Sequence, residues 1–323
     1  MVNFKLQEQN FSILSLYFLQ LSCGGSADIM GFLGVVWCRV PSRRFCVYFF
    51  GVEAKGGKRW LEILGVFRFQ PSEIMKITLP LMLAWYFHDR TTPPRLRDVL
   101  TAMLIIVLPV ILIVVQPDLG TGILVSLSGL AIIFFAGIKW KWVAYSLLLG
   151  LLFSPLVWFS MTDYQQGRVI TLLDPQSDPL GAGWHIIQAT TAIGSGGIFG
   201  KGLSMGTQSY LDFLPETKTD FIGAVLGEEL GFMGLSILIV FYSLIIARCV
   251  FMAVQSGSTF GRLLSGSLVV SFFGYAFVNV AMVCGLLPIV GVPLPLVSYG
   301  GTSIISLMIG FGIIMSMRYH KAW

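Results

Sequence analysis

The chain has 323 residues, of which 55% are hydrophobic and 11% are charged. An average soluble domain is about 25% charged, so this composition excludes a soluble globular domain and indicates a polytopic membrane protein. The net charge of +5 is small, and we expect no nucleic-acid partner. The five cysteines have neither C-x-x-C nor metal-ligand spacing, so we expect no disulfide framework and no structural zinc.

Residues 1–47 form an atypical N-terminal segment, which we separate from a membrane domain expected over residues 48–323. Residues 30–51 are long enough to span a bilayer, but they contain Arg39, Arg43 and Arg44. Each Arg near a helix centre costs roughly 2.5–3.5 kcal/mol on the insertion scale. Three of them oppose insertion strongly.

Residues 51–73 interleave cations with large apolar side chains, a pattern typical of a short amphipathic segment at the membrane interface. Lys55 and Arg59 belong to this group of cations, which could meet an anionic lipid headgroup. Pro71 and Glu73 then mark a helix start, where proline and a first-turn carboxylate are favourable. Lys76 lies three residues after Glu73, so both side chains occupy one helix face. We expect this pair to face a cavity or protein, not lipid.

Seven hydrophobic spans follow residue 70, and we expect them at about 74–87, 99–116, 122–138, 142–161, 221–247, 263–287 and 296–317. Lys and Arg gather in three of the connecting loops and in the C-terminal tail. These basic segments all fall on one side, which the positive-inside rule assigns to the cytoplasm. The cations from Lys55 to Arg68 are an exception, because they fall on the outer side. The extracytoplasmic loop 162–220 then carries three basic and six acidic side chains.

The loop 162–220 is the longest polar segment of the membrane domain, and loops of this length are usually functional. Asp220 lies where the loop meets the next span. It is either a helix cap or a partly desolvated general base. Asp212 and Glu216 lie close by and favour the functional interpretation. The glycine-rich residues 194–200 do not fit a dinucleotide fingerprint; they form a flexible turn near substrate or simply a turn.

Other polar residues interrupt the apolar pattern. Glu228 and Glu229 lie two turns into the span after Asp220 and mark either function or a structural hydrogen-bond network. Asp118 is either a turn residue or part of a cavity. His185 is a poor metal ligand because no second ligand lies at useful spacing. The uncharged break at 291–301 must line a cavity or be buried in protein.

Eight segments of the chain together resemble the SEDS family of shape, elongation, division and sporulation proteins, and favour its elongation branch over its division branch. The motifs occur in order from about residue 48 to the C-terminus: KGGKRW, RFQPSE, QPDLGTGILV, LLDPQSDPLGAGWHIIQ, AIGSGGIFGKG, FLPETKTDF, GEELG and PIVGVPLPLVSYGG.

The resemblance implies an all-α, polytopic helical bundle, with ten spans in the family, in the bacterial cytoplasmic (inner) membrane. It implies a peptidoglycan glycosyltransferase, a hexosyltransferase that polymerises lipid II into glycan strands during cell elongation and maintenance of rod shape. The partners it implies are a class B penicillin-binding protein and other membrane proteins of the elongation complex. The C-terminus is expected in the cytoplasm.

The resemblance also implies site residues. The essential aspartate of the family's PE-x-x-TD motif corresponds to Asp220, which would activate the acceptor's sugar hydroxyl. Glu73 and Lys76 match a buried pair in the family's central cavity, and Asp118 and Asp212 match acidic positions near the site. The remaining substrate or cavity candidates are Lys55, Arg59, Gln188, Lys201, Glu216 and Ser298. A divalent cation, Mg²⁺ or Mn²⁺, would help the diphosphate leave; no other cofactor is expected.

Residues 1–47 depart from the family, which has clean spans before the KGGKRW motif. We interpret this segment as an altered reading frame or a wrong start before Tyr48. Two other functions stay open for the membrane domain: a lipid II flippase, and a non-catalytic scaffold of the elongation machinery. The hypotheses differ at Asp220, because a glycosyltransferase needs an outward-facing base and a flippase needs an alternating path.

Overall fold

The computed structural model describes residues 52–54, 57–63, 67–116, 118–161, 163–178, 181–210 and 216–319. The predicted N-terminal segment 1–47 lies outside the described residues, as do Lys55 and Asp212. The chain divides into two compact units, Met1–Pro71 and Ser72–Trp323, and each unit is described by itself.

The described part of the first unit is a small antiparallel sheet with strand order β1-β2-β3. It consists of β1 (Val52–Ala54), β2 (Gly57–Ile63) and β3 (Phe67–Phe69). In the backbone register, Glu53 of β1 lies opposite Lys58 of β2, and Glu62 of β2 lies opposite Arg68 of β3. The segment predicted to lie at the interface therefore forms short strands, and Arg59 lies on the central one.

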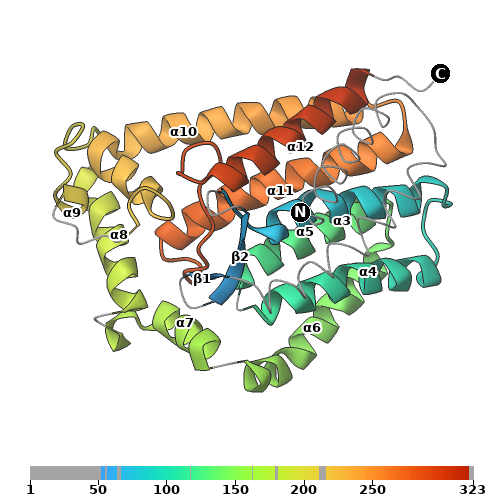
Figure 1. The fold of residues 1–323 in the computed structure, drawn as a ribbon, viewed down its shortest axis with the longest axis horizontal. Helices are drawn as coiled ribbons and strands as arrows, with labels where there is room; N and C mark the ends of the chain where they lie inside the picture. The colour runs from blue at the N-terminus through green and yellow to red at the C-terminus, as the bar shows by residue number, and fades with distance from the viewer. Residues whose placement is uncertain are drawn as a thin grey trace, which may run out of the picture. The chain divides into compact units, whose positions relative to one another are not determined.

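The second unit is built from helices, and all seven predicted spans are helical (Figure 1). The elements in order are α3 (Pro71–His88), α4 (Leu96–Val114), α5 (Leu119–Phe135), α6 (Trp140–Ser160), α7 (Asp163–Leu173), the short 3-10 helix η1 (Pro175–Ser177), α8 (Ala182–Gly196), α9 (Thr207–Tyr210), α10 (Ile222–Val254), α11 (Thr259–Val283) and α12 (Gly301–Tyr319). Four described helices, α4, α10, α11 and α12, are long and apolar enough to cross a membrane; α5 is a shorter apolar helix, and the Trp140–Leu156 part of α6 is apolar as well.

Helix α11 is the most buried of these spans and packs against α5, α10 and α12. Its small residues allow this close packing. The Ser267 hydroxyl donates a hydrogen bond to the Ser128 carbonyl on α5 at 2.7 Å, and a Cβ at Gly274 would lie 2.6 Å from the Leu127 side chain. Small residues and interhelical hydrogen bonds are the usual basis of helix association in membranes.

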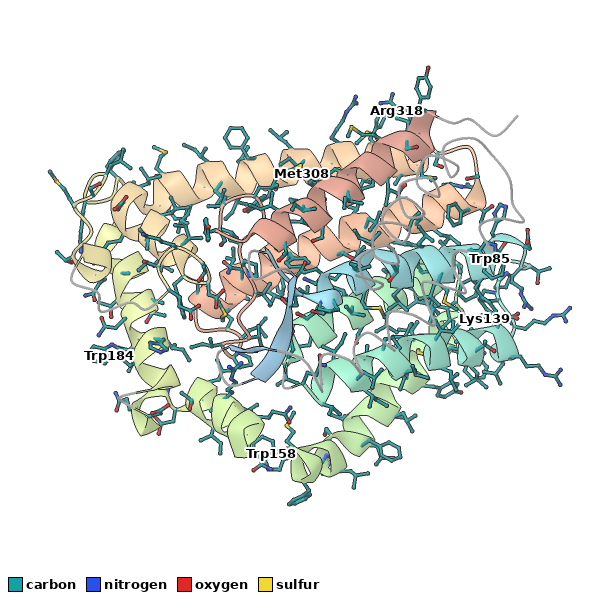
Figure 2. The ribbon with its side chains drawn as sticks, in the orientation of Figure 1. Trp85, Lys139, Trp158, Trp184, Met308 and Arg318 are labelled. Carbon is teal, nitrogen blue, oxygen red and sulfur yellow. The ribbon has the colours of Figure 1, made fainter. Side chains whose placement is uncertain are left out.

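The outer helices carry large apolar side chains that no part of the described chain covers. On α6, Leu148 is 65% exposed, Leu151 73% and Leu152 72%, and side chains project outward along this helix in Figure 2. An apolar surface of this extent is unstable in water. It suits a helix that faces lipid, which agrees with the polytopic architecture expected from composition.

Candidate active site

Residues 289–299 belong to the loop between α11 and α12, and we call them the 289–299 loop. They lie at the end of the helical unit that is predicted to face outward. Other elements bind the backbone of this loop. The Arg168 guanidinium on α7 donates to the Ile289 carbonyl, and the Tyr242 hydroxyl on α10 donates to the Pro295 carbonyl at 2.6 Å. The first turn of α5 approaches so closely that a Cβ at Gly120 would lie 2.7 Å from the Val290 carbonyl oxygen. This uncharged break is thus only partly buried in protein: Val292, Leu294 and Ser298 are buried, whereas Tyr299 is 81% exposed.

Asp220 lies at the end of the outer loop, directly before α10, and it is held against the 289–299 loop. Three consecutive carbonyls accept hydrogen bonds: Lys218 from the Tyr299 N–H at 2.9 Å, Thr219 from the Ser298 hydroxyl at 2.5 Å, and Asp220 from the Asn279 amide at 2.9 Å. Asp220 is not the cap residue of α10, because Phe221 occupies that position. Asp220 therefore lies one residue before the helix cap, and the role of its carboxylate stays a prediction.

The Asp220 carboxylate lies beside Gly291, since a Cβ at Gly291 would lie 3.6 Å from Asp220 Oδ2. Gly291 has a φ of +68°, a conformation that glycine adopts without a steric penalty. Asp118 lies near the same loop. It caps α5 by accepting a hydrogen bond from the Thr121 N–H at 3.3 Å and is 7% exposed. Asp118 and Asp220 therefore belong to two elements that pack on the 289–299 loop, and Asp118 is at least a structural cap.

Lys201 anchors the outer loop to α10 through Glu228, whose side chain is fully buried. The Lys201 ammonium lies 2.7 Å from Glu228 Oε1, and the Thr207 hydroxyl and the Gln208 N–H each donate to the same oxygen at 3.0 Å. An ionised carboxylate stays buried only when it is paired and hydrogen-bonded. Of the two interpretations open for Glu228, the structure supports the hydrogen-bond network.

The glycine-rich segment after α8 serves close packing against a break in α10. Gly231 interrupts α10 with φ +66° and ψ −163°. The Lys201 and Gly202 N–H groups donate to the Glu228 and Glu229 carbonyls, each at 3.0 Å. A Cβ at Gly200 would lie 2.1 Å from the Glu229 carbonyl oxygen. The glycines therefore allow this segment to satisfy the backbone groups that the helix break exposes, which supports a structural turn.

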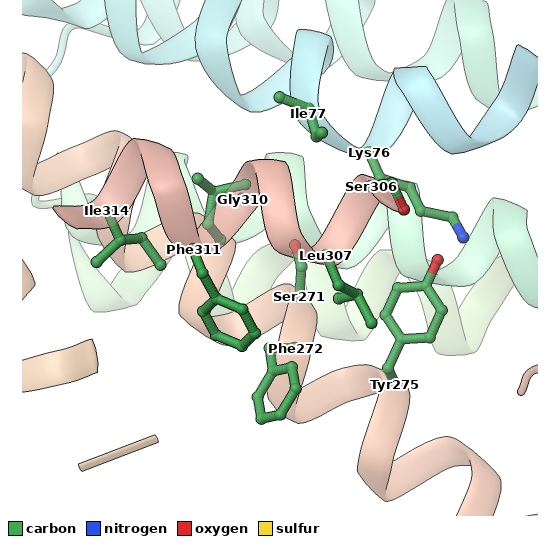
Figure 3. Close-up of a pocket in the computed structure, with 11 residues that line it drawn as sticks. Lys76, Ile77, Ser271, Phe272, Tyr275, Ser306, Leu307, Gly310, Phe311 and Ile314 are labelled. Atoms are coloured by element: carbon green, nitrogen blue, oxygen red, sulfur yellow. The ribbon is translucent and has the colours of Figure 1, made fainter. Parts of the chain in front are cut away.

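Glu73 and Lys76 form the predicted buried pair on α3. Glu73 Oε1 and Lys76 Nζ are 2.6 Å apart, and each side chain is 7% exposed. The Ser306 hydroxyl on α12 donates to Glu73 Oε2 at 2.9 Å, and Lys76 Nζ lies 4.2 Å from the centroid of the Tyr275 ring. Figure 3 shows Lys76 reaching toward Tyr275 at one end of a cavity whose other lining residues, including Phe272 and Phe311, are mostly apolar.

His185 lies half-buried on α8, near acidic residues of the loop. Burial lowers the pKa of its imidazole below the usual 6.5, against the opposite effect of the Asp178 and Glu216 carboxylates. Its ring centroid is 6.2 Å from that of Phe221. Glu216 accepts a hydrogen bond from the Thr219 hydroxyl at 3.2 Å, so this predicted site residue lies one turn before Asp220.

Among the described residues, no three or more His, Cys, Asp or Glu side chains are grouped so that they could hold a metal ion. The Mg²⁺ or Mn²⁺ suggested by the sequence stays a prediction. Gln188 lies half-buried on α8, and its role stays a prediction, as do those of Lys55, Arg59 and Asp212.

The sequence analysis missed several polar residues that complete these contacts. Asn279 is fully buried and also donates to the Val292 carbonyl at 2.7 Å. It is the one asparagine in the apolar stretch 259–283, and a lone amide in a span is a usable signal. Ser306 could not be found this way, because serine recurs in α11 and α12.

Comparison with known proteins decides the family. The model of the cell cycle protein family FtsW/RodA/SpoVE matches residues 31–322. The chain belongs to this family. It is the family predicted from the motifs, and the match extends upstream of residue 48.

Curated relatives agree with this family assignment. The chain is 54% identical over 273 residues to peptidoglycan glycosyltransferase MrdB of Escherichia coli K12, covering 84% of this chain and 74% of that one. It is 36% identical to a probable peptidoglycan glycosyltransferase FtsW of Geobacter sp. strain M18, covering 83% and 72%.

Two solved structures share the fold. A chain of a peptidoglycan synthase complex, described for the coordination of polymerization and crosslinking, superposes with a TM-score of 0.80 at 29% identity, covering 96% of this chain and 87% of that one. The rod shape determining protein RodA of Thermus thermophilus superposes with a TM-score of 0.64 at 26% identity, covering 96% and 85%. The polytopic membrane fold is therefore confirmed.

Proposed function

We propose that this chain is a peptidoglycan glycosyltransferase of the cell-elongation machinery that polymerises lipid II, with Asp220 as its general base. The family membership and the similarity to MrdB support the activity. The observation that carries the assignment of Asp220 is its placement: three hydrogen bonds fix the backbone at 218–220, and the carboxylate lies beside Gly291 without serving as a helix cap. General-base catalysis needs a carboxylate held in this way.

The proposed step is a displacement at the anomeric carbon of the donor. Asp220 accepts the proton of the acceptor's sugar hydroxyl, and the oxygen of that hydroxyl attacks the anomeric carbon. The bond from that carbon to the diphosphate breaks, and the polyprenyl diphosphate leaves with the bonding electron pair. A positioned carboxylate contributes about 10²–10⁴-fold to such a step. A divalent cation stays a proposal, and no step depends on it.

The arrangement of the helix ends supports the proposed orientation. The ends of α10 and α12 that carry Arg248 and Arg318 lie together, because both guanidiniums lie within 6 Å of the Phe251 ring, at 5.7 and 5.9 Å from its centroid. His88 at the end of α3 contacts Phe260 at the start of α11. Three of the four predicted cytoplasmic segments, those next to His88, Arg248 and Arg318, thus lie at one end, which agrees with the positive-inside rule. The C-terminus is proposed to be cytoplasmic, and Asp220 to face outward.

The proposed partners follow from the solved relative. One structural neighbour belongs to a complex that coordinates polymerization and crosslinking. We propose that this chain likewise works with a class B penicillin-binding protein, which crosslinks the strands, and with other membrane proteins of the elongation complex.

The test is polymerisation of labelled lipid II by the purified chain and its cognate penicillin-binding protein, with the transpeptidase blocked. Wild type should give glycan strands, and Asp220→Ala should give none while it remains folded and still co-elutes with the partner. Strand formation at the wild-type rate by Asp220→Ala would overturn the base assignment. Lipid II translocation across liposomes without any polymer would favour the flippase, and partner binding with neither activity would favour the scaffold.

A further inference from the structure

The backbone that carries Asp220 is held by residues of two other elements that the family motif around Asp220 does not include. Asn279 on α11 and Ser298 in the 289–299 loop donate to the carbonyls of Asp220 and Thr219, and the Tyr299 N–H donates to the carbonyl of Lys218. We call these three donors the clamp. Three successive bonded carbonyls leave the peptide planes before α10 little freedom to rotate.

Each side chain of the clamp makes a second bond that fixes its own position. The Asn279 amide also donates to the Val292 carbonyl at 2.7 Å, and its side chain is fully buried. The Ser298 hydroxyl also accepts from the Leu294 N–H at 2.8 Å and is 3% exposed. Asn279 thus joins Asp220 directly to the residue next to Gly291, the glycine that the Asp220 carboxylate approaches.

The backbone of the 289–299 loop also has an unusual conformation. Leu296 has a φ of +62° although it is not glycine, a conformation that costs energy and persists only where the surroundings enforce it. It lies inside the turn that Ser298 closes with Leu294, where the Ser298 N–H also donates to the Leu294 carbonyl at 3.0 Å. The hydrogen bonds within this turn therefore stabilise the conformation in which Ser298 reaches the Thr219 carbonyl.

We infer that Asn279 and Ser298 are positioning residues, which hold the Asp220 carboxylate where it can take the acceptor's proton. The inference rests on the proposed function of Asp220. Misplacement of a reacting group by about 1 Å can cost on the order of 100-fold in rate. A positioning role predicts loss of turnover with little loss of substrate affinity, since neither side chain needs to contact lipid II.

The test compares Ser298→Ala and Asn279→Leu with Ser267→Ala in the full chain, by steady-state polymerisation of labelled lipid II and by thermal unfolding in detergent. Ser267 is a matched control: its buried hydroxyl also donates across elements to a backbone carbonyl at 2.7 Å, but to Ser128 within the α5–α11 contact. Ser298→Ala removes two hydrogen bonds and Ser267→Ala removes one, so both variants should unfold below wild type, and Ser298→Ala at the lower temperature.

The expected result is that kcat falls at least tenfold in Ser298→Ala and in Asn279→Leu, with KM for lipid II within about twofold of wild type. Ser267→Ala should keep wild-type kcat. Unchanged kcat in Ser298→Ala, or an equal loss of kcat in Ser267→Ala, would overturn the positioning role. Asp220→Ala, measured in the same assay, separates the two claims. If Asp220→Ala is inactive while Ser298→Ala is fully active, only the positioning inference fails. If Asp220→Ala is fully active, the proposed function fails.

Discussion

Removing one member of the buried Glu73–Lys76 pair should destabilise the protein more than removing both. The two side chains are each 7% exposed and their charged atoms are 2.6 Å apart. Lys76→Met leaves the Glu73 carboxylate with the Ser306 hydroxyl as its remaining described partner. Glu73→Gln leaves the ammonium over the Tyr275 ring. Neither contact replaces an ion pair in a low-dielectric site.

An unpaired buried charge costs about 3–5 kcal/mol, whereas exchanging both members for neutral groups of similar volume is often close to neutral. One kcal/mol corresponds to roughly 2–4 °C in unfolding temperature for a chain of 150–250 residues. We therefore expect each single variant to unfold about 6–20 °C below wild type. The double variant should unfold within about 5 °C of wild type. Thermal unfolding in one detergent, followed by intrinsic fluorescence, measures these shifts.

Arg90→Gln provides the control. It removes an ion pair with Asp98 of similar length, 2.9 Å, but the Arg90 side chain is 48% exposed, and the Asp98 carboxylate, 9% exposed, keeps a hydrogen bond from the Arg95 N–H at 3.2 Å. A pair of this kind contributes about 1 kcal/mol or less, so the shift should be only a few degrees. Single variants of Glu73 and Lys76 that are no less stable than their double variant would refute the buried ion pair.

Three further predictions concern the outer loop. Glu228→Ala should destabilise by about 3 kcal/mol, because Lys201 and two further donors lose their buried acceptor; faster proteolysis at residues 201–210 would reveal it, and an unchanged rate would argue against the anchor. Gly231→Ala should cost more than about 3 kcal/mol in thermal unfolding, since a Cβ there would lie 2.3 Å from the Gly200 nitrogen, whereas Gly150→Ala on α6, with nothing within 4 Å, should be neutral or stabilising. The pKa of His185 lies below its unfolded value of 6.5, so the stability it contributes is present above pH 6.5 and is lost as the pH falls through the folded pKa; His185→Gln should weaken that dependence, and an identical pH profile would exclude it.

The helices were predictable because their signals are local. Apolar runs of span length with basic flanks located seven helices of the second unit, four of which are long and apolar enough to cross a membrane, and the spacing of Glu73 and Lys76 placed both on one helix face. The break at Gly231 was not predicted, since glycine within an apolar run does not by itself indicate a positive φ. It is decided by the close approach of Gly200, which is distant in sequence.

The site was only partly predictable, because several of its contacts join residues that are distant in sequence. Ser298 was identified through the family motif, and Asp220 through its place at the end of a polar loop. The bond from Asn279 to the Asp220 carbonyl joins residues 59 positions apart, and no local pattern encodes it. Glu228 was ambiguous from sequence, because a buried carboxylate has the same pattern in a catalytic site and in a network; its partners Thr207 and Gln208 distinguish the two.

Asp220→Asn tests the central claim most directly, because the amide has the shape of the carboxylate and leaves the backbone bonds at 218–220 intact, but it cannot accept the acceptor's proton. The turnover of labelled lipid II should fall by at least about 100-fold, the scale of general-base catalysis. Asp89→Asn, which changes an exposed carboxylate just after α3, should keep wild-type turnover. Turnover by Asp220→Asn within about twofold of wild type would contradict the account.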